Sequence, residues 1–305
     1  MGRFADFGSF VQGIPINANS GYVILSIDEL SVAQVPHSII LMIRDNNFFE
    51  LFKVGWLSAG LAILDINSEH SLIIVSNYGK TLELIDSNKL EGRIDEKFTA
   101  ENKINKRGPL RCIRTIGQHV YAVGGDRQCY RRDSSNIWID IASSCRPPIE
   151  DNTVYGFESI DGFSEKEIYG VGWRGEIWRF DGERWAKLDS PTNMLLTEIC
   201  CTGDGFVYIG GIEGLLIRGR NTVWEIVDTG GLINDIWGIR WFKGSLFISD
   251  MKGIYTLTDA GIEPIDLELN DLASFYKLNI TGDALWSIGE KNIASFEGVH
   301  WKQID

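Results

Sequence analysis

The sequence EIYGVGWRGEIWRFDGERWAKLDSP, residues 167–191, contains three strand-like runs joined by two tight turns. Its apolar residues alternate with small or polar ones and lack the i, i+3, i+4 spacing of an amphipathic helix. Asp181-Gly182 is a two-residue hairpin signal between the second and third runs. The stretch therefore predicts a short β-meander, whose strands are residues 167–173, 176–180 and 184–188.

The same pattern recurs toward the C-terminus with a constant period. The aromatic residue in the middle of the first run is Tyr169, and its equivalents Tyr208, Phe247 and Trp286 follow at intervals of 39 residues. The third run is marked by a tryptophan in most copies, at Trp138, Trp185, Trp224 and Trp301, and Ile262 takes this place in the remaining one. Such a period over several copies is the mark of a repeat architecture, and we expect these aromatic residues to form its core.

A further strand-like run precedes each copy, at residues 110–116, 154–160, 196–202, 236–242 and 275–281. Four strands in a period of about 40 residues, without helical segments between them, is typical of a β-propeller blade. Two weaker copies lie upstream, in residues 38–52 and 71–86. The sequence thus predicts an all-β propeller with four antiparallel strands in each blade, and seven blades, with six as the alternative.

The repeats predict one domain over residues 1–305, because blades that share a continuous core cannot stand alone. Residues 110–305 form five clear blades, and residues 1–109 form two weak blades with a long connection at 87–109. This connection is either a solvated insertion or a binding loop on the rim of the ring. We expect residues 1–30 to supply the inner strand of the first blade and to close the ring.

Composition points to a folded acidic protein. The chain has 29 basic and 42 acidic residues, a net charge of −13, and 44% hydrophobic residues. Its pI near 4.8 disfavours nucleic acid as a partner, because neutralising phosphates requires a concentrated basic face. No signal peptide or membrane-spanning stretch opens the sequence, so we expect a soluble protein of the cytoplasm that does not bind membranes.

Cysteine and histidine residues provide no recognisable site. The five cysteines are odd in number and have no recurring spacing, which disfavours a disulfide framework and favours a reducing compartment. The four histidines do not stand at metal-ligand spacing from one another or from a cysteine. We therefore predict no metal, no cofactor and no catalytic residue.

The candidate binding residues lie in the loops between the second and third strands of the blades, which emerge on one rim of the ring. Each of these residues is either simply solvated or part of a contact surface for a protein, in which Trp and Arg carry much of the energy. The set comprises Arg44, Asp45, Tyr78, Asp126, Arg127, Trp173, Arg174, Glu213, Asp250 and Glu290, together with Trp237 from a neighbouring connection.

The runs IYGVGWRGEIWRFDGERW and VYIGGIEGLLIRGRNTVW resemble the degenerate repeats of propellers with YVTN or bacterial-neuraminidase (Asp-box) repeats. The resemblance covers residues 110–305 and implies a propeller fold. That superfamily includes glycosidases, assembly factors and interaction scaffolds. The Asp-box Ser-x-Asp-x-Gly-x-Thr-Trp is only approximated here, since Asp181 adjoins Gly182 directly.

Three functions are compatible with these features. A glycosidase requires two opposed carboxylates or a sialidase arginine cluster, and no such constellation stands out. A non-catalytic protein-binding propeller fits better, because an acidic ring with a broad rim is suited to capturing a basic protein. Our best hypothesis is a monomeric immunity protein that binds and neutralises a cognate, basic toxin. The main alternative is an assembly or scaffolding propeller of a multiprotein complex.

Overall fold

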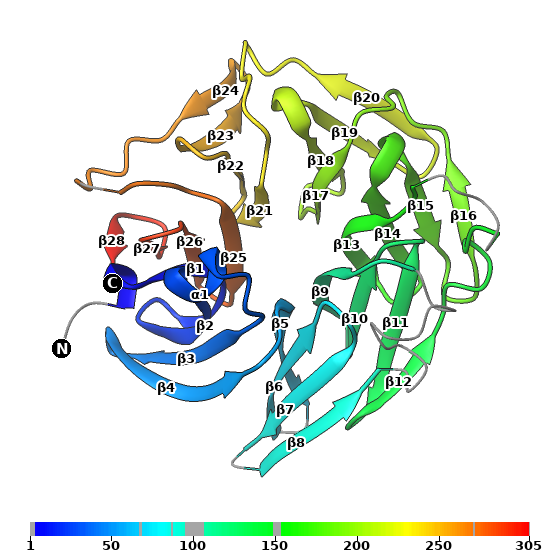
Figure 1. Cartoon of the computed structure of the whole chain (residues 1–305). Coiled ribbons are helices and arrows are strands. Elements are labelled where there is room, and N and C mark those ends of the chain that lie inside the picture. The colour runs from blue at the N-terminus through cyan, green and yellow to red at the C-terminus, as the bar shows by residue number, and fades with distance from the viewer. Residues whose placement is uncertain are drawn as a thin grey trace.

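Seven four-stranded antiparallel sheets form a ring in the computed structural model of the chain (Figure 1). The structure describes residues 4–66, 69–86, 88–94, 107–148, 154–270 and 272–304. The prediction of a seven-bladed propeller is confirmed. Within these residues, the helical elements are only α1 (Asp28–Val32) and the 3-10 turns η1 (Phe4–Asp6), η2 (Trp173–Gly175) and η3 (Ile212–Gly214).

Every blade consists of four consecutive strands. Blades 1 to 3 contain β1 (Gly8–Asn17), β2 (Ser20–Ile27), β3 (Ser38–Arg44) and β4 (Asn47–Val54); β5 (Ser58–Ile66), β6 (Glu69–Ser76), β7 (Lys80–Ile85) and β8 (Asn88–Arg93); and β9 (Leu110–Ile116), β10 (His119–Gly124), β11 (Gln128–Ser134) and β12 (Ile137–Asp140). Blades 4 and 5 contain β13 (Phe157–Ser164), β14 (Glu167–Gly172), β15 (Ile177–Phe180) and β16 (Trp185–Leu188); and β17 (Leu196–Cys201), β18 (Val207–Gly211), β19 (Leu216–Arg220) and β20 (Val223–Val227). Blades 6 and 7 contain β21 (Gly238–Phe242), β22 (Ser245–Ser249), β23 (Ile254–Thr258) and β24 (Gly261–Pro264); and β25 (Lys277–Thr281), β26 (Ala284–Ile288), β27 (Ile293–Phe296) and β28 (Trp301–Gln303).

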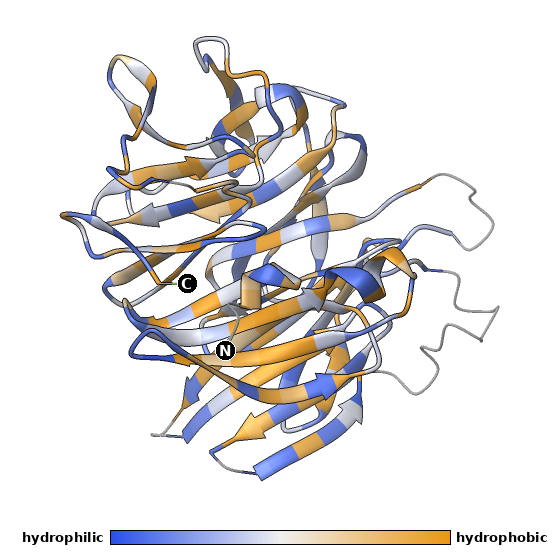
Figure 2. Cartoon of the chain, turned by 60° about the vertical axis from the view of Figure 1, so that its left-hand side comes forward, coloured by the Kyte–Doolittle hydropathy of each residue, from blue (hydrophilic) through white to orange (hydrophobic). Residues whose placement is uncertain are grey.

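Burial explains why the second strand of a blade carries the clearest repeat signal. In β14 all residues from Ile168 to Gly172 are buried, because neighbouring blades cover both faces of the sheet. Gly170 is required there, since a Cβ atom would lie 2.9 Å from the ring of Phe157. Figure 2 shows the sheets from the side, with hydrophobic residues along their strands. The aromatic anchors Tyr169 and Trp286 are fully buried, as the repeat predicts.

Blade 1 differs from its prediction. Residues 38–52 were expected to be second and third strands, but β3 and β4 are the third and fourth. The turn at Arg44 and Asp45 therefore lies on the opposite rim from the one predicted. The cause is that β3 is apolar and almost wholly buried, like an inner strand, while a ten-residue segment containing α1 separates it from β2.

The predicted connection at residues 87–109 is shorter than expected, because Asn88–Arg93 form β8, the outer strand of blade 2. Residues 95–106 of this connection lie outside the described part of the chain. Whether they form a binding loop therefore stays a prediction.

Strand β1 closes the ring by packing against β25 and β26 of blade 7 (Figure 1), and Phe4 and Ile304, near the two ends of the described chain, pack into the same cluster. The side chain of Asn279 donates to the carbonyl of Gly13 at 2.6 Å, and the indole of Trp286 donates to the carbonyl of Ala18 at 3.1 Å. The first thirty residues do supply the inner strand of blade 1, as predicted, and β2 as well.

Replacing Trp286 by alanine should destabilise the whole ring, because it opens a cavity in the seam and removes the hydrogen bond to Ala18. We expect a loss of about 3–5 kcal/mol in the free energy of unfolding, measured by chemical denaturation. Val223→Ala, at an exposed position, is the control and should change it by less than about 0.5 kcal/mol. A loss for Trp286→Ala as small as the control's would contradict the view that this seam holds the ring.

Candidate functional site

Two kinds of connection share one rim of the ring, which we call the loop rim. Antiparallel strands alternate in direction, so the links between second and third strands emerge on the same side as the links from one blade to the next. The second-to-third connections are residues 28–37, 77–79, 125–127, 173–176, 212–215, 250–253 and 289–292. Nine of the eleven predicted site residues lie on this rim. The other two, Arg44 at the end of β3 and Asp45 in the turn to β4, lie on the opposite rim, which corrects the prediction for blade 1.

Tight turns give the loop rim a fixed shape. Arg174 and Glu213 occupy equivalent positions in η2 and η3 and adopt left-handed conformations, with φ of 60° and 57°. The backbone N–H of Trp173 donates to the carbonyl of Gly156 at 3.1 Å, and that of Glu213 donates to the carboxylate of Asp235 at 2.9 Å. Each turn is thereby tied to the link before or after its own blade, which holds the rim in place.

The nine predicted residues on the loop rim differ in exposure. Four of them, Tyr78, Arg174, Glu213 and Glu290, are exposed to solvent. Asp126, Trp173 and Trp237 are partly buried. The indole of Trp173 donates to the carboxylate of Glu158 at 2.6 Å, and the Lys277 ammonium lies 6.0 Å from the ring centroid of Trp237.

Arg127 is buried and forms part of the joint between blades 3 and 4. Its guanidinium donates to both carboxylate oxygens of Glu176, at 2.7 and 2.9 Å, and lies 4.1 Å from the ring centroid of Tyr155 and 4.8 Å from that of Trp178. Burial alone would raise the pKa of Glu176, but hydrogen bonds from Arg127 and Lys187 outweigh it and lower this pKa. The pair is therefore ionised, and it joins blades 3 and 4 beneath the surface of the loop rim.

Asp250 is fully buried and organises its own turn. One carboxylate oxygen accepts from the backbone N–H groups of Lys252 and Gly253, at 2.7 and 2.8 Å. The other accepts from the side chains of Asn234 and Tyr255, at 2.8 and 3.1 Å. Because four donors within the protein satisfy both of its carboxylate oxygens, Asp250 shapes the turn and does not present its charge to a partner.

Exposed apolar side chains on the loop rim were missed in the sequence, apart from Tyr78. Whether such a side chain is exposed depends on the conformation of its loop, and the repeat pattern of the strands does not predict loop conformation. Among the described residues they are Phe7, Val32, Val35, Leu57, Tyr78, Val154, Ile233 and Met251.

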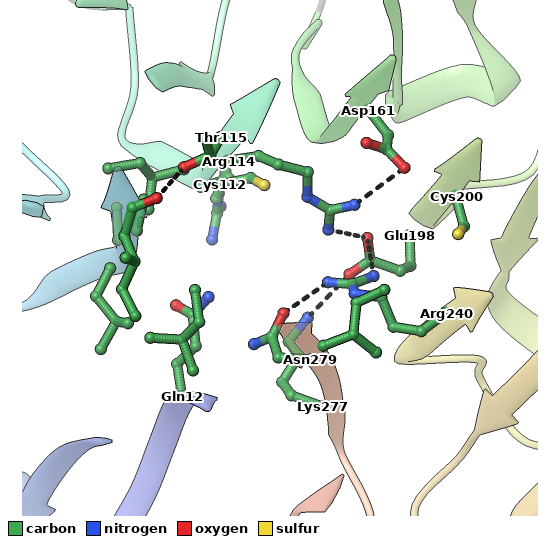
Figure 3. A pocket seen from close by; sticks show the side chains of 18 of the residues that line it. Gln12, Cys112, Arg114, Thr115, Asp161, Glu198, Cys200, Arg240, Lys277 and Asn279 are labelled. Atoms are coloured by element: carbon green, nitrogen blue, oxygen red, sulfur yellow. Dashed lines mark hydrogen bonds and ion pairs between the residues drawn. The ribbon is translucent and has the colours of Figure 1, made fainter. Parts of the chain in front are cut away.

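The ring encloses an axial channel, a cavity of about 600 Å³ lined by the first strands of the blades, and its charged lining was missed in the sequence. A charged cluster crosses it (Figure 3), formed by Arg114, Asp161, Glu198, Arg240 and Lys277. The available signal was the presence of charged residues inside otherwise apolar first strands, such as Arg114 in LRCIRTI and Arg240 in GIRWF.

Glu198 is the centre of this channel cluster. It accepts hydrogen bonds from Arg114 at 2.9 Å and from the hydroxyl of Ser159 at 2.7 Å, and it lies 3.4 Å from Arg240 and 3.9 Å from Lys277. Burial would raise the pKa of Glu198, but the surrounding cations outweigh it and lower the pKa to about 2. A carboxylate that stays ionised in this way cannot act as a general acid near neutral pH.

The described residues contain no group of three or more His, Cys, Asp or Glu side chains placed to hold a metal ion. All five cysteines carry free thiols. Burial raises the pKa of the channel-lining Cys200 to about 12, so its thiol is protonated at neutral pH. Among the same residues, no helix is long and apolar enough to cross a membrane.

Comparison with known proteins gives one close relative and many similar folds. The chain is 43% identical over 205 residues to the immune protein Tsi7 of Pseudomonas aeruginosa, and the match covers 67% of each chain. YCF48 from Cyanidioschyzon merolae superposes with a TM-score of 0.69 at 12% identity, over 94% of each chain. Virginiamycin B lyase from Staphylococcus aureus gives 0.60 at 14% identity, over 80% of this chain and 83% of the lyase. No protein-family model matches the chain.

Arg127 and Arg174 occupy neighbouring turns of the loop rim and should respond differently to substitution. Arg127→Ala leaves the carboxylate of Glu176 buried without its main partner, which should cost about 3–5 kcal/mol of stability. Arg174→Ala, at an exposed position, should cost less than about 0.5 kcal/mol. Thermal and chemical denaturation of the two variants measures the difference, and equal stabilities would show that the Arg127–Glu176 pair does not support the rim.

Glu198 should make the stability of the protein depend on acid pH. Its pKa is lowered from 4.5 to about 2 in the folded protein, so its ion pairs stabilise the fold above pH 4.5 and this contribution is lost as the pH falls toward 2. Over that window, unfolding of the wild type should take up about one proton more than unfolding of Glu198→Gln. Denaturation at a series of pH values measures the two slopes, and parallel slopes would contradict the assignment.

Proposed function

The chain belongs to the family of the immune protein Tsi7, and from this membership we propose that it protects by binding and neutralising a toxin protein. The immunity function predicted from the sequence is confirmed at the level of the family. The observation that carries the proposal is the 43% identity to Tsi7 over 205 residues. A propeller with a rigid, exposed rim is a suitable framework for such binding.

The loop rim is the surface that we propose for the toxin. Its turns are held by backbone and side-chain hydrogen bonds, so little conformational entropy needs to be lost on binding. It also presents exposed apolar side chains such as Val32 and Ile233 beside charged ones. An apolar centre with a polar surround is the usual composition of a protein interface.

Charge supports a basic toxin as the partner. The net charge of −13 attracts a cationic protein over long range and accelerates the encounter. We further propose that the protein acts as a cytoplasmic monomer without catalytic activity. The state of Glu198 supports the absence of catalytic activity. This carboxylate, the most deeply buried in the channel, stays ionised among its cations and so has no proton to donate near neutral pH. Kinship to the YVTN and Asp-box repeats is proposed on the repeat pattern alone.

Affinity capture followed by a growth assay tests the proposal. The tagged protein should retain one stoichiometric, basic partner from its native cells through a high-salt wash, because an apolar interface core resists screening. The captured partner, expressed alone, should stop growth of a host cell, and co-expression of this chain should restore it.

The tag alone is the control for capture, and the captured protein without this chain is the control for toxicity. Several weakly held partners, or a captured protein that is harmless alone, would instead support the scaffolding alternative.

A further inference from the structure

Blade 1 carries an elaboration that the other blades lack. Its connection between the second and third strands, residues 28–37, has ten residues, whereas the equivalent connections of the other six blades have three or four. We call it the α1 segment, because it begins with α1. Figure 1 shows α1 beside β1 and β2. Within the segment, Val32 is 86% exposed, the highest value among the large apolar residues of the described chain.

The base of the α1 segment is fixed, so the exposure of Val32 does not come from a loose loop. At one end Asp28 accepts hydrogen bonds from Ser9 at 2.6 Å and Lys291 at 2.5 Å. At the other end His37 Nε2 accepts from the backbone N–H of Ile27 at 2.7 Å, while Nδ1 donates to the carbonyl of Val35 at 2.6 Å. A segment held at both ends presents its tip in a defined position.

Five exposed apolar side chains lie on segments of blades 1 and 2 that hydrogen bonds join on the loop rim. The backbone N–H of Asp28 donates to the carbonyl of Phe7, which joins the α1 segment to the start of β1. After the segment, the hydroxyl of Ser38 donates to the carbonyl of Trp56, and the carbonyl of the next residue, Leu57, accepts from the turn of blade 2. These segments carry Phe7, Val32, Val35, Leu57 and Tyr78, which are between 45% and 86% exposed, and we call these side chains the α1 patch.

We propose that the α1 patch is the docking surface for the toxin, with Val32 as the side chain that the toxin buries. This inference rests on the proposed function and adds the location of the interface. A pre-positioned apolar side chain loses little entropy on binding, which favours tight association. The other six blades close with connections of three or four residues, so the ten residues of the α1 segment are not required to build the ring.

Charge around Val32 indicates the chemistry of the toxin surface. The exposed side chain of Glu29 lies within the α1 segment, and those of Asp6 and Glu290 lie in η1 and in the β26–β27 turn beside it. Glu290 is in reach of the same anchor, since Ser9 also approaches its carboxylate at 3.4 Å. An apolar centre with acidic neighbours is complementary to an apolar pocket bordered by Lys or Arg. We therefore expect the toxin to present such a pocket.

Val32→Arg tests the location with a closely matched control. Val299 is 77% exposed and lies in the turn before β28, on the opposite rim, so Val299→Arg introduces the same charge at similar exposure. We expect Val32→Arg to weaken binding to the captured toxin by at least about tenfold, because it places an unpaired charge in the interface core. Val299→Arg should leave the affinity unchanged, and both variants should melt like the wild type.

Hydrogen exchange gives a second measurement that needs no substitution, since the toxin should slow exchange within residues 28–37. Equal toxin affinity of the two arginine variants, with unchanged exchange, would overturn the docking site while leaving neutralisation intact. A wild type that neither binds nor protects would overturn the proposed function together with this inference. If Val32→Arg only converts a dimer of this chain into a monomer, the α1 patch joins two copies and the proposal is wrong.

Discussion

Each sheet of this protein has two apolar faces, and only a neighbouring blade can bury them. The hydrophobic clusters follow this rule, because they lie between blades. One cluster combines Tyr121 of blade 3 with Phe157 and Trp185 of blade 4, and another combines Val23 of blade 1 with Trp286 of blade 7. The seam between the first and last blades is therefore the same physical contact as the other joints, which makes closure of the ring a condition for the stability of every blade.

Ion pairs between neighbouring blades add a geometric constraint to this packing. Glu83 of β7 pairs with Arg132 of β11, and Glu167 of β14 pairs with Arg220 of β19, so each pair joins one blade to the next. Hydrophobic faces alone tolerate sliding, whereas a bidentate carboxylate–guanidinium pair has one favourable geometry. We infer that these pairs set how neighbouring blades lie against each other, while apolar burial supplies most of the stability.

The sequence predicted the parts of the fold that depend on a regular period. Tyr169 and its equivalents at intervals of 39 residues located the second strands, because burial on both faces constrains these positions in every blade. The strands of blade 1 were assigned wrongly, because the α1 segment breaks the period and β3 has the composition of an inner strand. Arg127 and Arg174 show a different limit, because equivalent turns place one guanidinium in a blade joint and the other in solvent. That distinction depends on partners distant in sequence.

The distribution of acidic residues connects this architecture to partner capture. Glu83, Glu176 and Glu198 are buried, and each is paired with at least one arginine. Such pairs are internally neutral and contribute little to the field outside the protein. The excess of negative charge must therefore reside on the remaining carboxylates, such as Glu29 and Glu213, which are exposed. Charge of this kind would attract the basic toxin that we propose from a distance, and the fixed apolar side chains of the loop rim would then hold it at short range.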